Sequence, residues 1–103
     1  MNDGPAAFIS TMIETELTEV LHALGDPIRL AIVRELADGQ PRACGTFGHL
    51  GVSHSTLSHH FKALREAGVI ETHAEGQRRL NTLRREELAA RFPGLLDSVL
   101  REG

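Results

Sequence analysis

Apolar residues recur at every third or fourth position in the first quarter of the chain, a spacing that places them along one side of an α-helix. These positions are Phe8, Ile9, Met12, Ile13, Leu17, Val20, Leu21 and Leu24. The pattern predicts a helix over about residues 5–24, and Gly25 follows it as a residue suited to a helix C-terminus. The first predicted element is therefore an amphipathic helix.

A second helix is predicted directly after the first. Asp26 is a good N-cap, and Pro27 fits the first helical position, where its missing amide hydrogen is not needed. Apolar side chains then surround the helix almost completely, so we expect it to be the most deeply buried one. They are Ile28, Leu30, Ile32, Val33 and Leu36. Asp38 and Gly39 close this helix, and residues 41–50 are predicted to form a loop that leads into a short helix.

Residues 53–67 separate into two chemically different faces when the chain is wound at about 100° per residue. Leu57, Phe61 and Leu64 share one side, which suits a core. The other side carries hydroxyls, imidazoles and cations, with no acidic residue before Glu66. This polar face comprises His54, Ser55, Ser58, His59, Lys62 and Arg65. Because such a face can lie against an anionic surface with readable edges, we interpret the segment as a recognition helix for the DNA major groove.

A serine and a glycine are predicted to begin and end this helix, and a second glycine divides the element that follows it. Ser53 is the predicted N-cap, and Gly68 is the predicted stop. Two short stretches with β-branched residues follow, 69–75 and 77–83, and Gly76 separates them. Such stretches around a central glycine are typical of a β-hairpin. A helix-turn-helix followed by a hairpin indicates a β-wing.

The last part of the chain is predicted to be helical from about residue 84, and Pro93 must kink or restart the helix. Its apolar face comprises Leu88, Phe92, Leu95, Leu96, Val99 and Leu100. The predicted fold class is therefore mainly α with a β-hairpin wing. We expect a winged helix-turn-helix formed by a single domain over residues 1–103.

Composition narrows the class of protein. A chain of 103 residues, of which 41% are hydrophobic, is expected to form one small globular domain. No apolar run reaches the roughly 18–20 residues of a membrane span, and the N-terminal residues lack the pattern of a signal peptide. The single cysteine, Cys44, cannot form an intrachain disulfide. We therefore expect a cytoplasmic protein with no membrane partner.

The net charge of −3 argues at first against a nucleic-acid partner, but the charges are unevenly distributed. Residues 1–50 carry three basic and seven acidic side chains, whereas residues 51–85 carry six basic and three acidic ones. The six basic residues are Lys62, Arg65, Arg78, Arg79, Arg84 and Arg85. Positive charge is thus concentrated in the predicted recognition helix and the segment after it, as a local basic patch.

Two motifs occur in a fixed order along the chain. Residues 22–36 read HALGDPIRLAIVREL, and residues 51–70 read GVSHSTLSHHFKALREAGVI. The first resembles the opening motif of the ArsR/SmtB transcriptional repressors, and the second resembles the signature of that family almost position by position. Residues 75–79, EGQRR, look like the wing of the family. The resemblance implies a homodimeric winged-helix repressor on an inverted-repeat operator in double-stranded DNA, which it leaves when an inducer, often a metal ion, binds.

The resemblance also implies which residues contact DNA. The polar face described above matches the DNA-facing residues of the family, and its hydroxyls and imidazoles can donate to phosphates or base edges. Its cations suit phosphate anchoring, and the two wing arginines would reach an adjacent groove or the DNA backbone. The predicted DNA contacts are Ser53, His54, Ser55, Thr56, Ser58, His59, Lys62, Arg65, Arg78 and Arg79. His60, at the edge of the apolar stripe, is interpreted instead as a core or interface histidine.

Cys44 is the candidate sensor residue. It matches the second cysteine of the Cys-x-Cys pair carried by metal sensors of the family, but Arg42 stands at the first position, so a soft-metal thiolate site lacks a ligand. The other metal site of the family uses His, Asp and Glu of the C-terminal helices, and residues 84–103 contain no histidine. We therefore expect no metal and no cofactor. Cys44 is either a small buried hydrophobe, as most free cysteines are, or a redox or thiol-reactive sensor.

The terminal helices, within residues 1–24 and 84–103, carry more apolar positions than a short domain can cover. Pairing with the same helices of a second subunit would bury them, and a two-fold axis would place two recognition helices about one DNA turn apart. We therefore predict a homodimeric repressor. The alternative, which the acidic net charge favours, is a winged-helix protein-interaction module without DNA binding. An enzyme is disfavoured, because the chain has neither a phosphate-binding glycine loop nor a nucleophile elbow.

Overall fold

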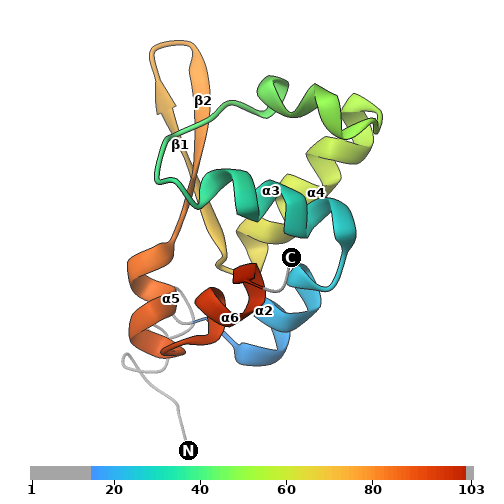
Figure 1. Ribbon diagram of the computed structural model, residues 1–103. Coiled ribbons are helices and arrows are strands. Elements are labelled where there is room, and N and C mark those ends of the chain that lie inside the picture. The colour runs from blue at the N-terminus through green and yellow to red at the C-terminus, as the bar shows by residue number, and fades with distance from the viewer. Residues whose placement is uncertain (1–14, 102–103) are drawn as a thin grey trace, which may run out of the picture.

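Asp26 and Pro27 begin helix α3 (Pro27–Leu36) in the computed structural model of the protein, which describes residues 15–101 (Figure 1). The Asp26 carboxylate accepts hydrogen bonds from the amides of Ile28 and Arg29, at 2.9 and 3.1 Å, and so caps the helix as predicted. The fully buried side chains of α3 are Ile32, Val33 and Leu36. Helix α3 therefore contributes the centre of the core.

Helix α2 (Leu17–Leu24) is shorter than predicted. Thr15 and Glu16 are not helical, which corrects the prediction, and residues 5–14 lie outside the described part of the chain. Thr15 is buried against the turn at Gly68, where an added Cβ would come within 2.3 Å of the threonine hydroxyl. Because this contact joins residues far apart in the sequence, the helical periodicity of the sequence does not predict it.

The apolar stripe of α2 is only partly buried in the single chain. Val20, Ala23 and Leu24 face the core, whereas Leu17 and Leu21 are 43% and 46% exposed. The predicted stripe is therefore divided between a core-facing side and an exposed apolar edge.

The helix-turn-helix continues through η1 (Cys44–Leu50), a 3₁₀ helix, into α4 (His54–Glu66). Gly51 makes the turn between them with a φ of +80°, a backbone conformation that favours glycine. Ser53 caps α4, since its hydroxyl oxygen accepts a hydrogen bond from the Thr56 amide at 3.1 Å. The predicted N-cap of the recognition helix is confirmed.

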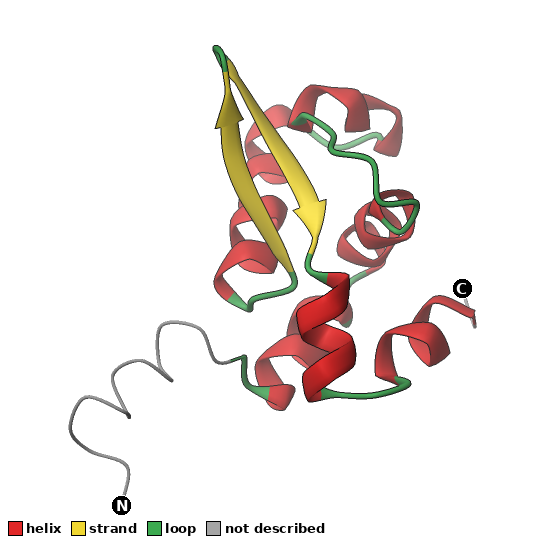
Figure 2. Ribbon diagram, turned by 90° about the vertical axis from the view of Figure 1, so that its left-hand side faces the viewer, coloured by secondary structure: helices red, strands yellow, loops and turns green. Residues whose placement is uncertain are grey.

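The wing is a two-stranded antiparallel hairpin of β1 (Ile70–Glu75) and β2 (Arg78–Leu83), as predicted. Its register begins with Ile70 opposite Leu83 at the base, and Gly76 makes the turn with a φ of +65°. Figure 2 shows the hairpin extending away from the helices. The strands therefore leave most of their outer residues in solvent.

The chain forms two C-terminal helices, α5 (Arg85–Arg91) and α6 (Leu95–Arg101), where the sequence predicts one that kinks or restarts. Pro93 and Gly94 separate them, and Gly94 has a φ of +84°. Leu88 of α5 and Leu96 of α6 are buried. Both helices lie with α2 at the end of the molecule opposite the wing tip (Figure 1).

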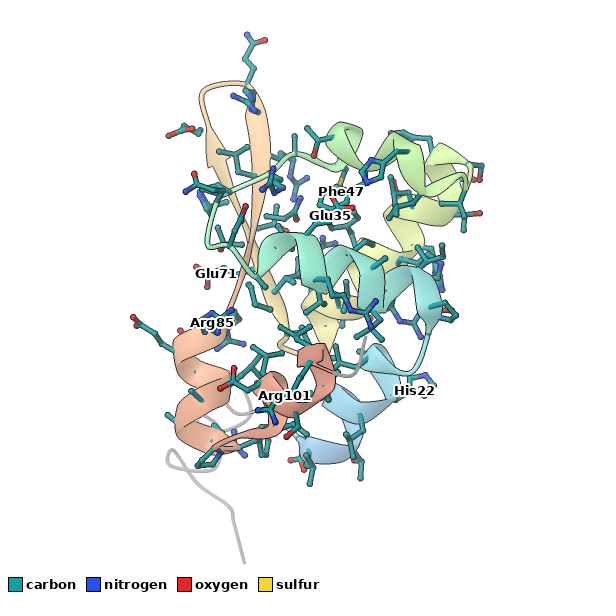
Figure 3. All side chains as sticks on the ribbon, viewed as in Figure 1. His22, Glu35, Phe47, Glu71, Arg85 and Arg101 are labelled. Carbon is teal, nitrogen blue, oxygen red and sulfur yellow. The ribbon has the colours of Figure 1, made fainter. Side chains whose placement is uncertain are left out.

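One hydrophobic core connects the helices with the base of the hairpin. Phe47, labelled in Figure 3, is completely buried and meets Phe61 of α4 edge to face, with ring centroids 5.2 Å apart. This contact joins η1 to α4. None of the helices within residues 15–101 has the length and apolar character needed to cross a membrane.

Candidate nucleic-acid interface

The polar side of α4 is open to solvent along its length. Leu57, Phe61 and Leu64 are buried on the opposite side. Lys62 Nζ lies 4.0 Å from the carboxylate of Glu66, and both side chains are well exposed, so this pair contributes little to stability. The exposed residues of the polar side are His54, Ser55, Ser58, His59, Lys62 and Arg65. The predicted recognition residues of α4 therefore share one surface.

Two residues of the predicted DNA contacts, Ser53 and Thr56, also start the helix. The Ser53 hydroxyl accepts from the Thr56 amide at 3.1 Å and donates to the Thr56 hydroxyl at 2.9 Å. Both side chains are exposed. Their hydrogen bonds fix the first turn of α4, which presents His54 and Ser55.

A groove of about 240 Å³ lies between α4 and the wing. It is lined by Cys44, His54, Ser58, Phe61, Arg65, Thr72, Arg79 and Asn81. Two arginines therefore border one groove, Arg65 from α4 and Arg79 from β2. Cations on both sides give the groove a field that attracts a polyanion such as a phosphate backbone.

The two wing arginines lie on opposite faces of the hairpin. Cross-strand partners share a face, whereas successive residues of a strand alternate between faces. Arg79 pairs with Ala74 and lines the groove toward α4, whereas Arg78 pairs with Glu75 on the other face. The sequence predicts DNA contacts for both arginines, and the structure places them on different faces of the hairpin.

The sequence model described as "Bacterial regulatory protein, arsR family" matches residues 26–72, from the N-cap of α3 into β1. The "Uncharacterized HTH-type transcriptional regulator YceK" of Bacillus subtilis (strain 168) is 35% identical over 83 residues, which cover 79% of this chain and 83% of that protein. The chain belongs to the arsR family of bacterial regulatory proteins.

This arsR-family chain is also similar to a repressor and to a solved DNA-binding domain. The "Arsenical resistance operon repressor" of Staphylococcus xylosus is 37% identical over 73 residues, 71% of this chain and 70% of that protein. The homodimeric winged helix-turn-helix DNA-binding domain of Mb0332 from Mycobacterium bovis matches with a TM-score of 0.67 and 28% identity, over 99% of this chain and 89% of that one. The protein is a DNA-binding transcriptional regulator with a winged helix-turn-helix fold, not an enzyme.

The thiolate metal site that the arsR family implies does not fit the residues around Cys44. At the first ligand position, Arg42 donates to the Asp38 carboxylate and, through Nε at 3.4 Å, to the Glu35 carbonyl. The Gln40 amide lowers the pKa of Asp38, and the Arg42 charge lowers it further, together outweighing the effect of desolvation. Arg42 is thus a paired cation that fastens the loop to the end of α3. Within residues 15–101, no three His, Cys, Asp or Glu side chains are grouped so that they could hold a metal ion.

Asn81 of β2 anchors the wing of this regulator. It is 1% exposed, its Oδ1 accepts from the Thr72 hydroxyl at 2.7 Å, and its Nδ2 donates to the Arg42 carbonyl at 3.1 Å. The backbones of Asn81 and Arg42 exchange two further hydrogen bonds, at 3.0 and 2.8 Å. The sequence pattern does not single this residue out, although an asparagine within a predicted strand is uncommon and is the available signal.

Cys44 lies beside residues of the predicted DNA-contact surface. Its side chain is half-buried, and Sγ is 3.7 Å from Asn81 Nδ2. It lines the groove between α4 and the wing and also a cavity of about 190 Å³ that adjoins His54 and Ser58. The thiol is therefore less buried than a core cysteine.

Proposed function

We propose that this regulator is a homodimeric repressor that binds an inverted-repeat operator in double-stranded DNA and leaves it when an inducer binds. The observation that carries the proposal is one exposed surface, formed by the polar side of α4 and the groove beside the wing. Helix α4 would enter the major groove, because its polar side combines short hydrogen-bonding groups with cations. Arg79 would then lie beside the DNA backbone.

Different residues of this surface are proposed to supply affinity and sequence preference. Ser58 and His59 are in the middle of the exposed face of α4 and carry short donors, which suits base edges. Lys62, Arg65 and Arg79 are proposed to bind phosphates. Each phosphate contact steepens the dependence of log affinity on log salt concentration by about 0.9.

The proposed dimer is supported by the exposed apolar edge of α2, formed by Leu17 and Leu21. The similar domain of Mb0332 is homodimeric, and the similar protein of Staphylococcus xylosus is named a repressor. A two-fold axis would present two copies of α4 to two half-sites about one DNA turn apart.

The inducer is proposed to act without the thiolate metal site of the family, because Arg42 replaces the first ligand and is paired with Asp38. Cys44 is the candidate sensor, as a thiol that borders the proposed DNA surface. A bacterial transcription regulator acts on chromosomal DNA, so we place the protein in the cytoplasm.

DNA selected from a random duplex library by the wild-type protein supplies the operator for a test by fluorescence anisotropy. We expect the double variant Ser58→Ala/His59→Ala to bind this DNA at least about 100-fold more weakly, since each base contact contributes about 1–3 kcal/mol. Binding to unrelated DNA should change little, because the phosphate contacts remain. The matched control is His73→Ala, which removes an imidazole at an exposed position outside the proposed surface.

The outcomes separate the two functions considered for this chain. Operator binding that survives the Ser58→Ala/His59→Ala change contradicts the choice of recognition face. A wild-type protein that enriches no sequence from the library contradicts the repressor proposal and favours the protein-interaction module.

A further inference from the structure

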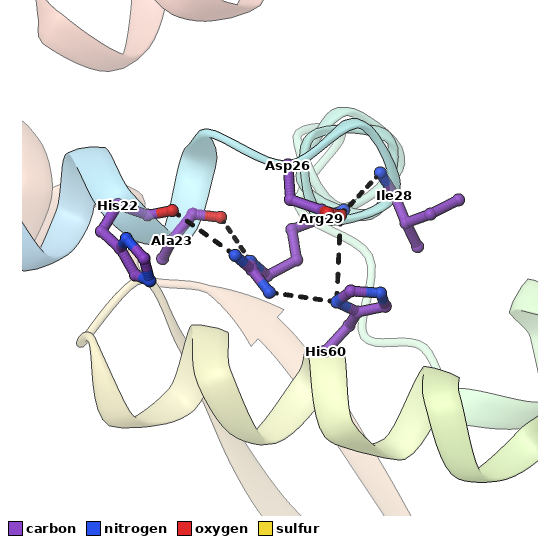
Figure 4. Close-up of polar contacts among 6 residues, drawn as sticks. All are labelled: His22, Ala23, Asp26, Ile28, Arg29 and His60. Carbon is purple, nitrogen blue, oxygen red and sulfur yellow. Dashed lines mark hydrogen bonds and ion pairs between the residues drawn. The ribbon is translucent and has the colours of Figure 1, made fainter.

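Arg29 connects three helices at the back of the recognition helix (Figure 4). It lies in the first turn of α3, and its Nε donates to the Ala23 carbonyl of α2 at 2.7 Å. One terminal nitrogen is 3.5 Å from the His22 carbonyl, and the other is 3.1 Å from Nδ1 of His60 on α4. One planar guanidinium group therefore ties α2 and α3 to the middle of α4.

His60 differs from its neighbours on α4. It is 9% exposed, whereas His54 and His59 are exposed on the polar face. Burial agrees with the core or interface role predicted from its angle on the helix. The charged groups beside its ring are Arg29 and, with Oδ2 3.9 Å from Nδ1, Asp26. On its own helix the His59 ring lies 5.8 Å away.

The contact between Arg29 and His60 identifies which ring nitrogen of the imidazole accepts a hydrogen bond. An arginine donates hydrogen bonds and never accepts them, so Nδ1 of His60 must be the acceptor. The ring proton is then on Nε2 in this arrangement. His60 is therefore a directional acceptor inside a packed interface.

Apolar packing alone leaves the rotation of α4 loosely specified. The contacts of Leu57 and Leu64 are non-directional, and related packings of similar stability differ by small rotations of the helix. A hydrogen bond from a planar guanidinium restrains both distance and angle. Because His59 directly precedes His60, a rotation of α4 that breaks this bond also moves the residues proposed to read DNA.

We propose that Arg29 and His60 are positioning residues for DNA recognition: their hydrogen bond sets the rotation at which α4 presents Ser58 and His59 to the operator. This inference rests on the DNA-binding function proposed above. It assigns His60 a role without any contact to DNA, through the orientation of its helix.

Two substitutions of His60 separate positioning from packing. In His60→Asn the amide oxygen takes nearly the place of Nδ1 and can accept from Arg29, whereas His60→Leu fills the site without an acceptor. We expect His60→Leu to lose at least about tenfold in affinity for the selected operator, equivalent to about 1.4 kcal/mol, with little change on unrelated DNA. His60→Asn should stay within about threefold of the wild type, which is about 0.7 kcal/mol.

Circular dichroism and sedimentation of each variant establish that it is folded and has the oligomeric state of the wild type. Should His60→Leu fail to fold, Arg29→Lys provides the same test, because an ammonium group keeps the charge but cannot span both Ala23 and His60 in one plane. It should then lose operator affinity to a similar degree.

Each result bears on one conclusion. Equal operator affinity of His60→Leu, or of Arg29→Lys, and the wild type overturns the positioning role. Equal losses in His60→Asn and His60→Leu also overturn it, since the acceptor would then be irrelevant. Failure of the wild type itself to prefer any DNA would instead contradict the proposed function.

Discussion

Replacing Leu17 and Leu21 of α2 by glutamine should dissociate the proposed dimer while each protomer stays folded. Both side chains are close to half exposed in the single chain, so they contribute less to the protomer core than Val20 or Leu24. Glutamine has a length and a helix propensity close to those of leucine, so the change leaves α2 itself nearly unaffected. The substitution acts on the surface between subunits.

The size of the effect follows from the exposed fractions of the two side chains. Full burial of a leucine contributes about 1.5–3 kcal/mol, so covering a remaining 43% or 46% contributes about 0.7–1.3 kcal/mol. A two-fold dimer covers each side chain twice, for a total of about 3–5 kcal/mol. Since about 1.4 kcal/mol is tenfold, the dimer dissociation constant should rise by roughly two to three and a half orders of magnitude.

Sedimentation velocity over a concentration series measures this dissociation constant. The matched control is Glu19→Gln, an exposed residue of α2 that lies about 200° around the helix from Leu17. Circular dichroism should show the same helix content for both variants. Operator affinity should fall along with dimerisation, because a monomer engages a single half-site. A Leu17→Gln/Leu21→Gln protein that sediments like the wild type at every concentration refutes the role of α2 in the dimer.

The remaining predictions concern the wing, the cap of α3 and the thiol. Arg79→Ala should reduce the salt slope of operator binding by about 1.8, which is about 0.9 for each protomer of the proposed dimer, while Arg78→Ala leaves it nearly unchanged. Equal slopes for the two variants would contradict the groove assignment. Desolvation would raise the pKa of Asp26, but the Arg29 amide and the charges of His60 and Arg29 outweigh it and lower this pKa below 3.8. The charged carboxylate therefore stabilises the fold above that value, and this contribution is lost as pH falls through the lowered pKa. The comparison variant is Asp26→Asn, which keeps a capping oxygen but has no charge. In urea unfolding, the free energy of unfolding of the wild type should fall more steeply below about pH 4 than that of Asp26→Asn. Parallel acid profiles would show that the charge is unimportant. Cys44→Ser should leave operator release by metals and metabolites unchanged in anisotropy assays, and a selective loss of release by thiol oxidants would identify Cys44 as a sensor.

Helix caps, turn glycines and the faces of α4 were predictable because each depends on residues close together in the chain. Asp26 and Ser53 cap their helices through amides two or three residues away. The turn of the wing at Gly76 likewise needs only local geometry. These features therefore follow from sequence patterns alone.

The start of α2 was not predictable, because Thr15 is held by a contact with Gly68 across the fold. Alternation along a predicted strand places Arg78 and Arg79 on opposite faces, but the sequence gives no indication of which face lies toward α4. That choice depends on the pairing of β2 with β1 and on the position of the hairpin beside α4. Contacts of this kind have no counterpart in local periodicity.

The sequence by itself determined the class of the protein, because an amphipathic helix with a cap and a polar, acid-free face is encoded within the 13 residues 53–65. The tertiary structure alone decided how that face is held. Asn81 meets the loop at Arg42 across 39 residues, and Arg29 meets His60 across 31. A buried polar group needs a hydrogen-bond partner, and that partner can be far away in the sequence. Which distant residue becomes the partner depends on how the helices and strands pack, and local sequence patterns do not show it.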